Sequence, residues 1–279
     1  MIGRRTLLTG LVGAIGARAV AAPLAKVRSS GRMSVALYRD FQPWSWQKAG
    51  KLTGIDVELA QLIGKDMGVA IDPVEFIADE NVDDDLRNIV WRGSVAGGGI
   101  ADIMMHAPID SEFTKRNDRA AFVAPYHHEQ FAIACDGRTI DCDGDFGTLR
   151  DRNVAVETDS VPDTYMLGSL GGRKRETVIH KTSGPAAVAA MIAGEVPLVM
   201  ATRAQIENGL ADVPGKFTIR KASIPGLFST GWDVGIAVKD DSRDLGEQIA
   251  KIVAAAVTDG RVDVIFARFG VTRAKPVTV

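Results

Sequence analysis

The sequence predicts an α/β protein built on mixed, mostly parallel sheets. Runs typical of strands alternate with helical patterns at short intervals, which is the order expected of α/β units. Several strand runs are apolar without alternation, as in strands buried on both faces of a parallel sheet. About 257 residues remain after residue 22, so we expect one large or two medium-sized units.

The first 22 residues have the pattern of an export signal. A cationic head with Arg4 and Arg5 precedes a weakly apolar run that is too short and too rich in glycine to span a bilayer stably. Small residues follow, so we expect cleavage near Ala21 or Ala22 and a periplasmic mature protein. The paired arginines fit a twin-arginine signal, while ordinary secretion stays open. No cysteine lies near the cleavage site and no later run suits a membrane span, so no membrane anchor is expected.

The charge of the mature chain makes nucleic acid a poor partner. Removing Arg4, Arg5 and Arg18 with the signal takes the formal net charge from −2 to about −5. The chain has two cysteines, Cys135 and Cys142. In an oxidising compartment this pair predicts a structural disulfide rather than a redox pair, since the spacing is not Cys-x-x-Cys, and no second ligand pair exists for zinc.

In the first part of the chain, apolar runs predict three strands and a helix. The helix covers residues 56–68, with Asp56 as a candidate cap. Trp44 and Trp46 stand in an exposed aromatic turn and project to opposite sides if the segment is extended, so one can pack while the other lines a cleft. The strands are expected at 33–37, 69–76 and 102–105.

The acidic run at 79–85 has two interpretations. Asp79, Asn81 and Asp83 begin like a calcium loop, but the glycine and glutamate that should follow are Asp84 and Val90. The alternative is a helix that Asn81 caps, with acids in its first turn. We prefer the helix.

Residues 101–134 join a buried strand, a polar loop that carries Arg116, and an apolar run ended by Pro125. A new strand is expected to start at Gln130. Further on, a strand at 153–156 leads into a polar loop and a helix that begins near Pro162. Such a helix start binds anions, although Ser160 or Asp159 could simply cap it. Later strands are expected at 178–180, 196–200 and 231–238, and helices at 186–193, 245–256 and 262–269.

Four short segments together resemble the periplasmic solute-binding proteins that serve amino acid importers, which have the type II binding-protein fold. They are GIDVELA at 54–60, APY at 124–126, VAV at 154–156, and GIAVKD at 235–240 followed by Asp259 and Gly260. The resemblance implies two lobes joined by two crossing strands, with a ligand between them. Lobe I would comprise 30–128 and 238–279, and lobe II 129–237.

The amino acid clamp of that family is only partly matched. The resemblance assigns the arginine that grips the α-carboxylate to Arg116, nine residues before Pro125. Phe113 stands where the family has threonine, and the loop before Arg116 is longer than usual. The family's amine-binding acid corresponds to Pro197 or Thr202, and its anion loop reads Asp159-Ser160. An ordinary amino acid is therefore not the expected ligand.

A narrower resemblance comes from residues 79–88 and 104–110. These segments are similar to the binding-protein-like MoxJ, MxaJ and XoxJ proteins encoded beside pyrroloquinoline-quinone-dependent methanol dehydrogenases. That resemblance implies an accessory role, with a periplasmic quinoprotein dehydrogenase as partner and no cofactor of the chain's own. Candidate aromatic contacts, at least half of which we expect in the core, are Trp44, Trp46, Phe113, Tyr126 and Trp232.

Three classes of function thus stand: importer receptor for a small solute with an ABC permease as partner, dehydrogenase accessory, and enzyme. For the enzyme, His106, His127, His128 and Glu129 could supply acid–base groups. Adjacent histidines on a strand point to opposite sides, and no nucleophile–base spacing accompanies them, so neither catalysis nor a metal site is the favoured interpretation.

Overall fold

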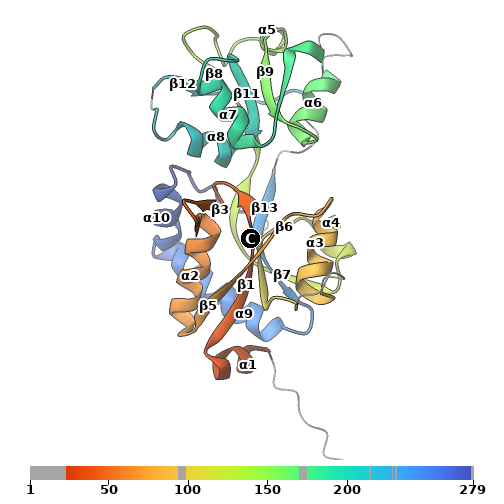
Figure 1. Cartoon of the computed structure of the whole chain (residues 1–279), viewed down its shortest axis with the longest axis vertical. Helices are drawn as coiled ribbons and strands as arrows, with labels where there is room; N and C mark the ends of the chain where they lie inside the picture. The colour runs from red at the N-terminus through yellow and green to blue at the C-terminus, as the bar shows by residue number, and fades with distance from the viewer. Residues whose placement is uncertain are drawn as a thin grey trace, which may run out of the picture.

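The computed structural model has two five-stranded sheets, one above the other in Figure 1, which we call lobe I and lobe II. It describes residues 23–93, 99–169, 175–213, 215–227, 229 and 231–277. The predicted signal at 1–22 lies outside these residues. In the described part of the chain, no helix combines the length and the apolar character needed to cross a membrane.

Lobe I is built on the sheet β5-β1-β6-β13-β7. The first three strands run parallel, and β13 is antiparallel to both of its neighbours, so the sheet is mixed. Pro73 lies in β5, which is an edge strand, where the missing N–H costs no ladder bond. The strands are β1 (Arg32–Tyr38), β5 (Ala70–Phe76), β6 (Ile103–Ile109), β7 (Ala120–Glu129) and β13 (Trp232–Lys239).

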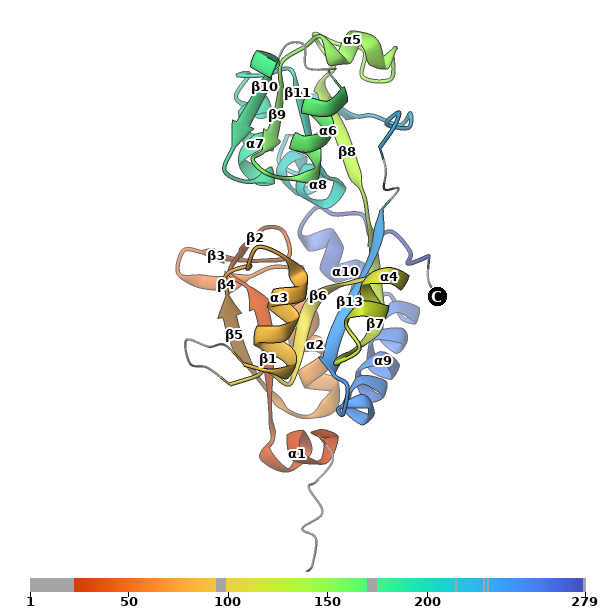
Figure 2. The same cartoon turned by 90° about the vertical axis from the view of Figure 1, so that its right-hand side faces the viewer.

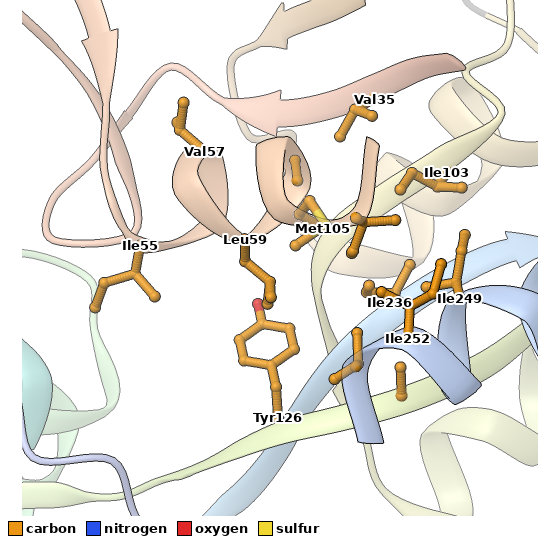
Figure 3. Close-up of a cluster of buried hydrophobic side chains, with 14 of the residues drawn as sticks. Val35, Ile55, Val57, Leu59, Ile103, Met105, Tyr126, Ile236, Ile249 and Ile252 are labelled. Atoms are coloured by element: carbon orange, nitrogen blue, oxygen red, sulfur yellow. The ribbon is translucent and has the colours of Figure 1, made fainter. Parts of the chain in front are cut away.

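Both faces of the lobe I sheet are covered by helices, as the unbroken apolar strands predict. Val35 and Ile103 face the larger core with α2 and α9, shown in Figure 3, whereas Ala36 and Met104 face a second core under α3 and α4. The helices are α1 (Pro23–Ser30), α2 (Ile55–Met67), α3 (Val82–Leu86), α4 (Ser111–Arg116), α9 (Arg243–Thr258) and α10 (Arg261–Arg268), and the small sheet beside them comprises β2 (Asp40–Phe41), β3 (Ser45–Lys48) and β4 (Lys51–Thr53).

Lobe II repeats this layered arrangement on the sheet β10-β9-β11-β8-β12. Ala134 and Val199 face the core under α7, and Ile133 and Met200 face the opposite core. The strands are β8 (Phe131–Asp136), β9 (Val154–Glu157), β10 (Val178–Lys181), β11 (Leu198–Thr202) and β12 (Phe217–Ile219), and the helices are α5 (Phe146–Arg150), α6 (Val161–Ser169), α7 (Gly184–Ile192) and α8 (Arg203–Leu210).

Two connections join the lobes. β7 of lobe I continues through Gln130 into β8 of lobe II, and the chain returns into β13 (Figure 2). The two crossing segments stay in contact, because Trp232 is paired with Glu129 and the imidazole Nδ1 of His128 lies 2.7 Å from Asp233 Oδ1. The boundaries of 128/129 and 237/238 stay a prediction, although β13 lies in the lobe I sheet over its whole length.

Three local expectations need correction. Asp56 does not cap α2, whose first residue is Ile55; the Asp56 side chain is buried inside lobe I. Pro125 does not end its strand, because β7 absorbs it at an irregularity where Ala124 adopts a φ of 53° and the pairing with β13 shifts. The loop expected before Arg116 is instead the end of β6 and the helix α4, which Asp110 caps.

The helix interpretation of the acidic run is confirmed. The Asn81 side chain accepts a hydrogen bond from the Asp84 amide at 2.9 Å, and α3 begins directly after it. The helix continues as a π-helical turn at Arg87–Trp91. Among the described residues, no group of three or more histidine, cysteine or acidic side chains is arranged to hold a metal ion.

The predicted disulfide between Cys135 and Cys142 is confirmed, and it links the end of β8 to the following loop. A loop this short still restricts the unfolded chain, so replacing both cysteines by serine should lower the free energy of unfolding by about 2 kcal/mol. Urea unfolding of the oxidised wild type and the double variant measures this difference. Equal midpoints for the two proteins would show that the bond adds nothing to stability.

Candidate functional site

A cavity of about 680 Å³ lies between the lobes and is lined by residues of both. Lobe I contributes the segment after β1, the segment from β5 to α3, and the β6 strand. Lobe II contributes Phe131, Glu157 and Val161, and the return connection contributes Ser229 and Trp232. Another hollow, of about 500 Å³, lies on lobe I alone beside α2 and β5. Because the first cavity is framed by both lobes and by the crossing segments, we take it as the candidate site and call it the cleft.

Aromatic rings form much of the cleft wall. On the lobe I side, the Tyr38 ring lies 4.4 Å from Phe76 and 5.7 Å from Phe41, measured between ring centroids. Near the crossing segments, Phe131 and Trp232 are 5.1 Å apart. Five aromatic side chains therefore reach the cleft from both lobes, which suits a ligand with apolar or cationic surface.

Carboxylates line the cleft beside these rings. Asp85 is buried, accepts hydrogen bonds from the Tyr38 hydroxyl at 2.7 Å and the Asp79 amide at 2.8 Å, and has its pKa raised by burial. On the lobe II side, Glu157 accepts from the Gly184 amide at 2.8 Å, and partial burial raises the pKa of this carboxyl as well. Asp40, Asp79 and Glu80 also belong to the lining.

Among the described residues that line the cleft, Arg39 is the one arginine or lysine. Its side chain is exposed at the rim, and no ion pair with it is formed within the described residues. The lining thus carries five acidic residues against one arginine, which favours positively charged groups in the cleft.

His106 stands at the floor of the cleft in an unusual environment. Its backbone has a φ of 60°, which is uncommon for a residue with a side chain and often marks a functional position. The ring is packed against Phe41 and Trp44, at centroid distances of 4.9 and 4.4 Å. Its Nδ1 lies 3.2 Å from Asp56 Oδ2, but neither atom makes a hydrogen bond. The other Asp56 oxygen accepts from the Tyr126 hydroxyl at 2.6 Å.

The structure places Arg116 away from the cleft lining. The residue ends α4, where its guanidinium donates to both carboxylate oxygens of Asp83 at 2.8 and 3.2 Å and lies over the Phe113 ring. Phe113 itself is buried in the smaller lobe I core. The helix that Asp110 starts turns Arg116 toward α3 rather than toward lobe II.

Replacing Arg116 by alanine should therefore leave ligand binding in the cleft unchanged. The pair with Asp83 is exposed, so the effect on stability should also be small. Isothermal titration of the variant with any ligand of the wild type measures this. A loss of affinity would show that Arg116 leaves Asp83 to reach the ligand.

The remaining predicted contact residues are scattered. Of the predicted set, His106 and Trp232 line the cleft. Trp44 and Tyr126 are fully buried in lobe I, and Trp46 packs on Phe269. Ser160 and Thr202 serve as caps at the starts of α6 and α8, since each oxygen accepts an amide hydrogen bond, from Asp163 and Gln205 respectively. Binding roles for these residues stay predictions.

His127 and Glu129, two of the candidate acid–base groups on β7, are buried within the protein. His127 is buried between Trp44 and Phe266, accepts from the Ala274 amide at 3.2 Å, and has its pKa lowered to about 3 chiefly by burial. Glu129 is 1% exposed, and burial raises its pKa to about 7 despite a hydrogen bond from the Gln130 amide.

Most of the cleft lining was missed from the sequence, although one signal pointed to it. In open α/β sheets, ligands bind beyond the carboxyl ends of the strands. Tyr38 ends β1, Phe76 ends β5 and Glu157 ends β9, so the rule selects all three. Phe131 carries no such signal, because it begins a strand.

No protein-family model matches the chain, and no curated protein is significantly similar. Solved structures do match. One is an ancestral cationic amino acid solute binding protein, with a TM-score of 0.70 and 19% identity over 88% of this chain and 99% of that one. Another is an amino acid ABC transporter substrate-binding protein of Streptococcus pneumoniae bound to L-arginine, with a TM-score of 0.64 and 19% identity over 91% and 100%. A third is a solute receptor for L-cysteine of Neisseria gonorrhoeae, with a TM-score of 0.59 and 17% identity over 88% and 92%. The chain therefore has the two-lobed α/β fold of periplasmic binding proteins.

Proposed function

We propose that this chain is an exported, non-catalytic binding protein that holds a small ligand between its two lobes. The observation that carries the proposal is the cleft of about 680 Å³, which has walls on both lobes and the crossing segments at its side. A ligand there touches both lobes at once, so its binding favours a closed arrangement over an open one. The role of an importer receptor follows if a permease recognises the closed form.

Of the four candidate acid–base groups, only His106 belongs to the described cleft lining, so the four do not come together in the cleft, which supports a non-catalytic role. His127 is enclosed by aromatic rings in lobe I and does not belong to the cleft lining. Glu129 is a buried residue at the end of β7 and is likewise absent from the lining.

A thermal-shift screen of the full exported chain tests the proposal. A true ligand at about a hundredfold excess over its Kd should raise the melting temperature by about 5 °C or more. Trp232→Ala, in the cleft, should abolish this rise. Trp46→Ala, which removes a half-buried tryptophan from the lobe I surface beside Phe269, is the matched control and should keep it. A ligand that stabilises both variants equally well would place binding outside the cleft.

The dehydrogenase-accessory role is a second candidate, favoured by one observation. The two segments that carry the narrower resemblance both supply cleft residues: Asp79, Glu80 and Asp85 from one, and His106 and Pro108 from the other. In this role, a segment of a quinoprotein dehydrogenase would occupy the cleft. Deleting the gene should then lower pyrroloquinoline-quinone-dependent methanol oxidation, and the two proteins should co-purify. Unaltered methanol oxidation in the deletion strain would remove this candidate.

A further inference from the structure

We propose that the cleft selects an organic cation that carries no carboxylate, such as an alkylamine, a guanidino amine or a quaternary amine. The inference rests on the proposed function, because it names the ligand class of the same cleft. Four features of the lining lead to it.

The first feature is acidic charge on both sides of the cleft. Asp85 on lobe I and Glu157 on lobe II are partly or fully buried, and each is hydrogen-bonded only to neutral protein donors in the described residues. Burial without a cationic partner destabilises their charged forms, so the pKa of each is raised. A cation bound between them would supply the missing countercharge, and it would bring the two lobes together.

The second feature is the aromatic wall beside these acids. Phe131 and Trp232 form a pair that lines the same cleft as Glu157, and Tyr38 and Phe41 line it from lobe I. Ring faces attract desolvated cations, and the attraction adds to that of a nearby carboxylate. A neutral apolar ligand would gain from the rings but would leave the buried acids without a partner.

The third feature is that groups expected to hold a carboxylate are engaged elsewhere. Arg116 is bound to Asp83. At the start of α6, the Asp159 amide donates to Asp163 Oδ2 at 3.0 Å, and the Asp163 amide donates to Ser160 Oγ at 3.2 Å. These contacts occupy two of the amide donors, those of Asp159 and Asp163, with which such a loop could bind an anion, and they place the Asp163 carboxylate beside the loop.

The fourth feature is His106, a polar residue that is 8% exposed and lines the cleft floor. Its Nδ1 lies 3.2 Å from Asp56 Oδ2 inside lobe I, and its backbone is held in the left-handed region. A positive φ at a residue with a side chain is costly and often marks a functional position. The imidazole packs edge-on against the Phe41 ring, so His106 continues the aromatic wall of the cleft.

Matched pairs of probes that differ in a carboxylate test the inference directly. Isothermal titration of the full exported chain compares agmatine with L-arginine, cadaverine with L-lysine, and choline with glycine betaine. In at least one pair the member without the carboxylate should bind about tenfold tighter or better. Glu157→Gln should weaken that binding about tenfold, and Asp40→Asn, at an exposed site, should weaken it less. Glu195→Gln, an exposed lobe II position paired with Lys181, is the control and should have no effect.

The outcomes separate the inference from the proposed function. Equal or tighter binding of the carboxylated members overturns the cation class while leaving a receptor in place. The cation class is also overturned, with the receptor role kept, if none of the six probes binds but a neutral or anionic solute does. Loss of that binding in Trp232→Ala would show that the solute lies in the cleft. If Glu157→Gln does not fold, the result for Asp40→Asn decides, since unchanged affinity there overturns the charge argument. A chain that binds no solute of any class contradicts the proposed function itself.

Discussion

The His127→Phe variant should lose much less stability than the wild type when the pH falls from 6.5 to 3. Burial lowers the pKa of His127 to about 3, whereas the unfolded chain takes up the same proton near pH 6.5. Below pH 6.5 the unfolded state therefore binds more protons than the folded state, and stability falls with pH until the folded-state pKa is reached. The contribution of this one residue is at most about 5 kcal/mol.

Phenylalanine suits the site because His127 already packs between Trp44 and Phe266, at 5.3 and 5.1 Å between ring centroids. The variant loses the hydrogen bond from the Ala274 amide, which shifts the free energy of unfolding at every pH but does not change its dependence on pH. Urea unfolding at pH 4, 5, 6 and 7 measures this dependence. His180→Phe, at an exposed histidine, is the control. Parallel profiles for wild type and His127→Phe would mean that His127 takes up its proton in the folded state as well.

The Glu129→Gln variant should show the opposite pH dependence. Burial raises the pKa of Glu129 to about 7 from 4.5, so between these values the folded state binds more protons than the unfolded state. Stability contributed by the protonated acid is present below pH 4.5 and is lost as the pH rises through 7. Removing the charge should therefore stabilise the protein at pH 8 by about 3 kcal/mol at most, with little effect at pH 4.5.

Glutamine keeps an oxygen that can accept from the Gln130 amide, as Glu129 does at 2.8 Å. The measurement is the difference in unfolding free energy between variant and wild type at pH 4.5 and pH 8. Glu195→Gln, at an exposed acid, should show no such difference between the two pH values. An equal effect of Glu129→Gln at both values would mean that the folded state does not hold the proton.

The parts of the fold that the sequence predicted are those set by local patterns. β1, β6 and β9 follow from mainly apolar runs, α3 follows from the capping chemistry of Asn81, and the disulfide follows from two cysteines in a chain that the sequence predicts to be exported. The prediction that a strand ends at Pro125 was wrong. A proline usually ends a strand, but here the irregular pairing between β7 and β13 accommodates it.

The cleft could not be assembled from local patterns, because its walls come from segments far apart in the chain. Tyr38 and Asp85 of lobe I line one cleft with Glu157 of lobe II only once both sheets and the crossing strands are formed. The position of Arg116 could not be predicted for a related reason: its distance from Pro125 fits a clamp, whereas Asp110 starts α4 and the arginine is bound to Asp83 in the structure. Asp56 looked like a cap, yet Tyr126, 70 residues away in the chain, binds it.

The distance between the lobes is the measurement that tests the central claim most directly, namely that a ligand is held in the cleft. Lys48 on lobe I and Thr164 on α6 of lobe II are exposed and can each be replaced by a spin-labelled cysteine. Pulsed electron paramagnetic resonance then gives the distance distribution with and without the best-binding probe. A ligand held by both lobes should shorten and narrow the distribution, and Trp232→Ala should prevent the change. An unchanged distribution at saturating ligand would contradict binding between the lobes.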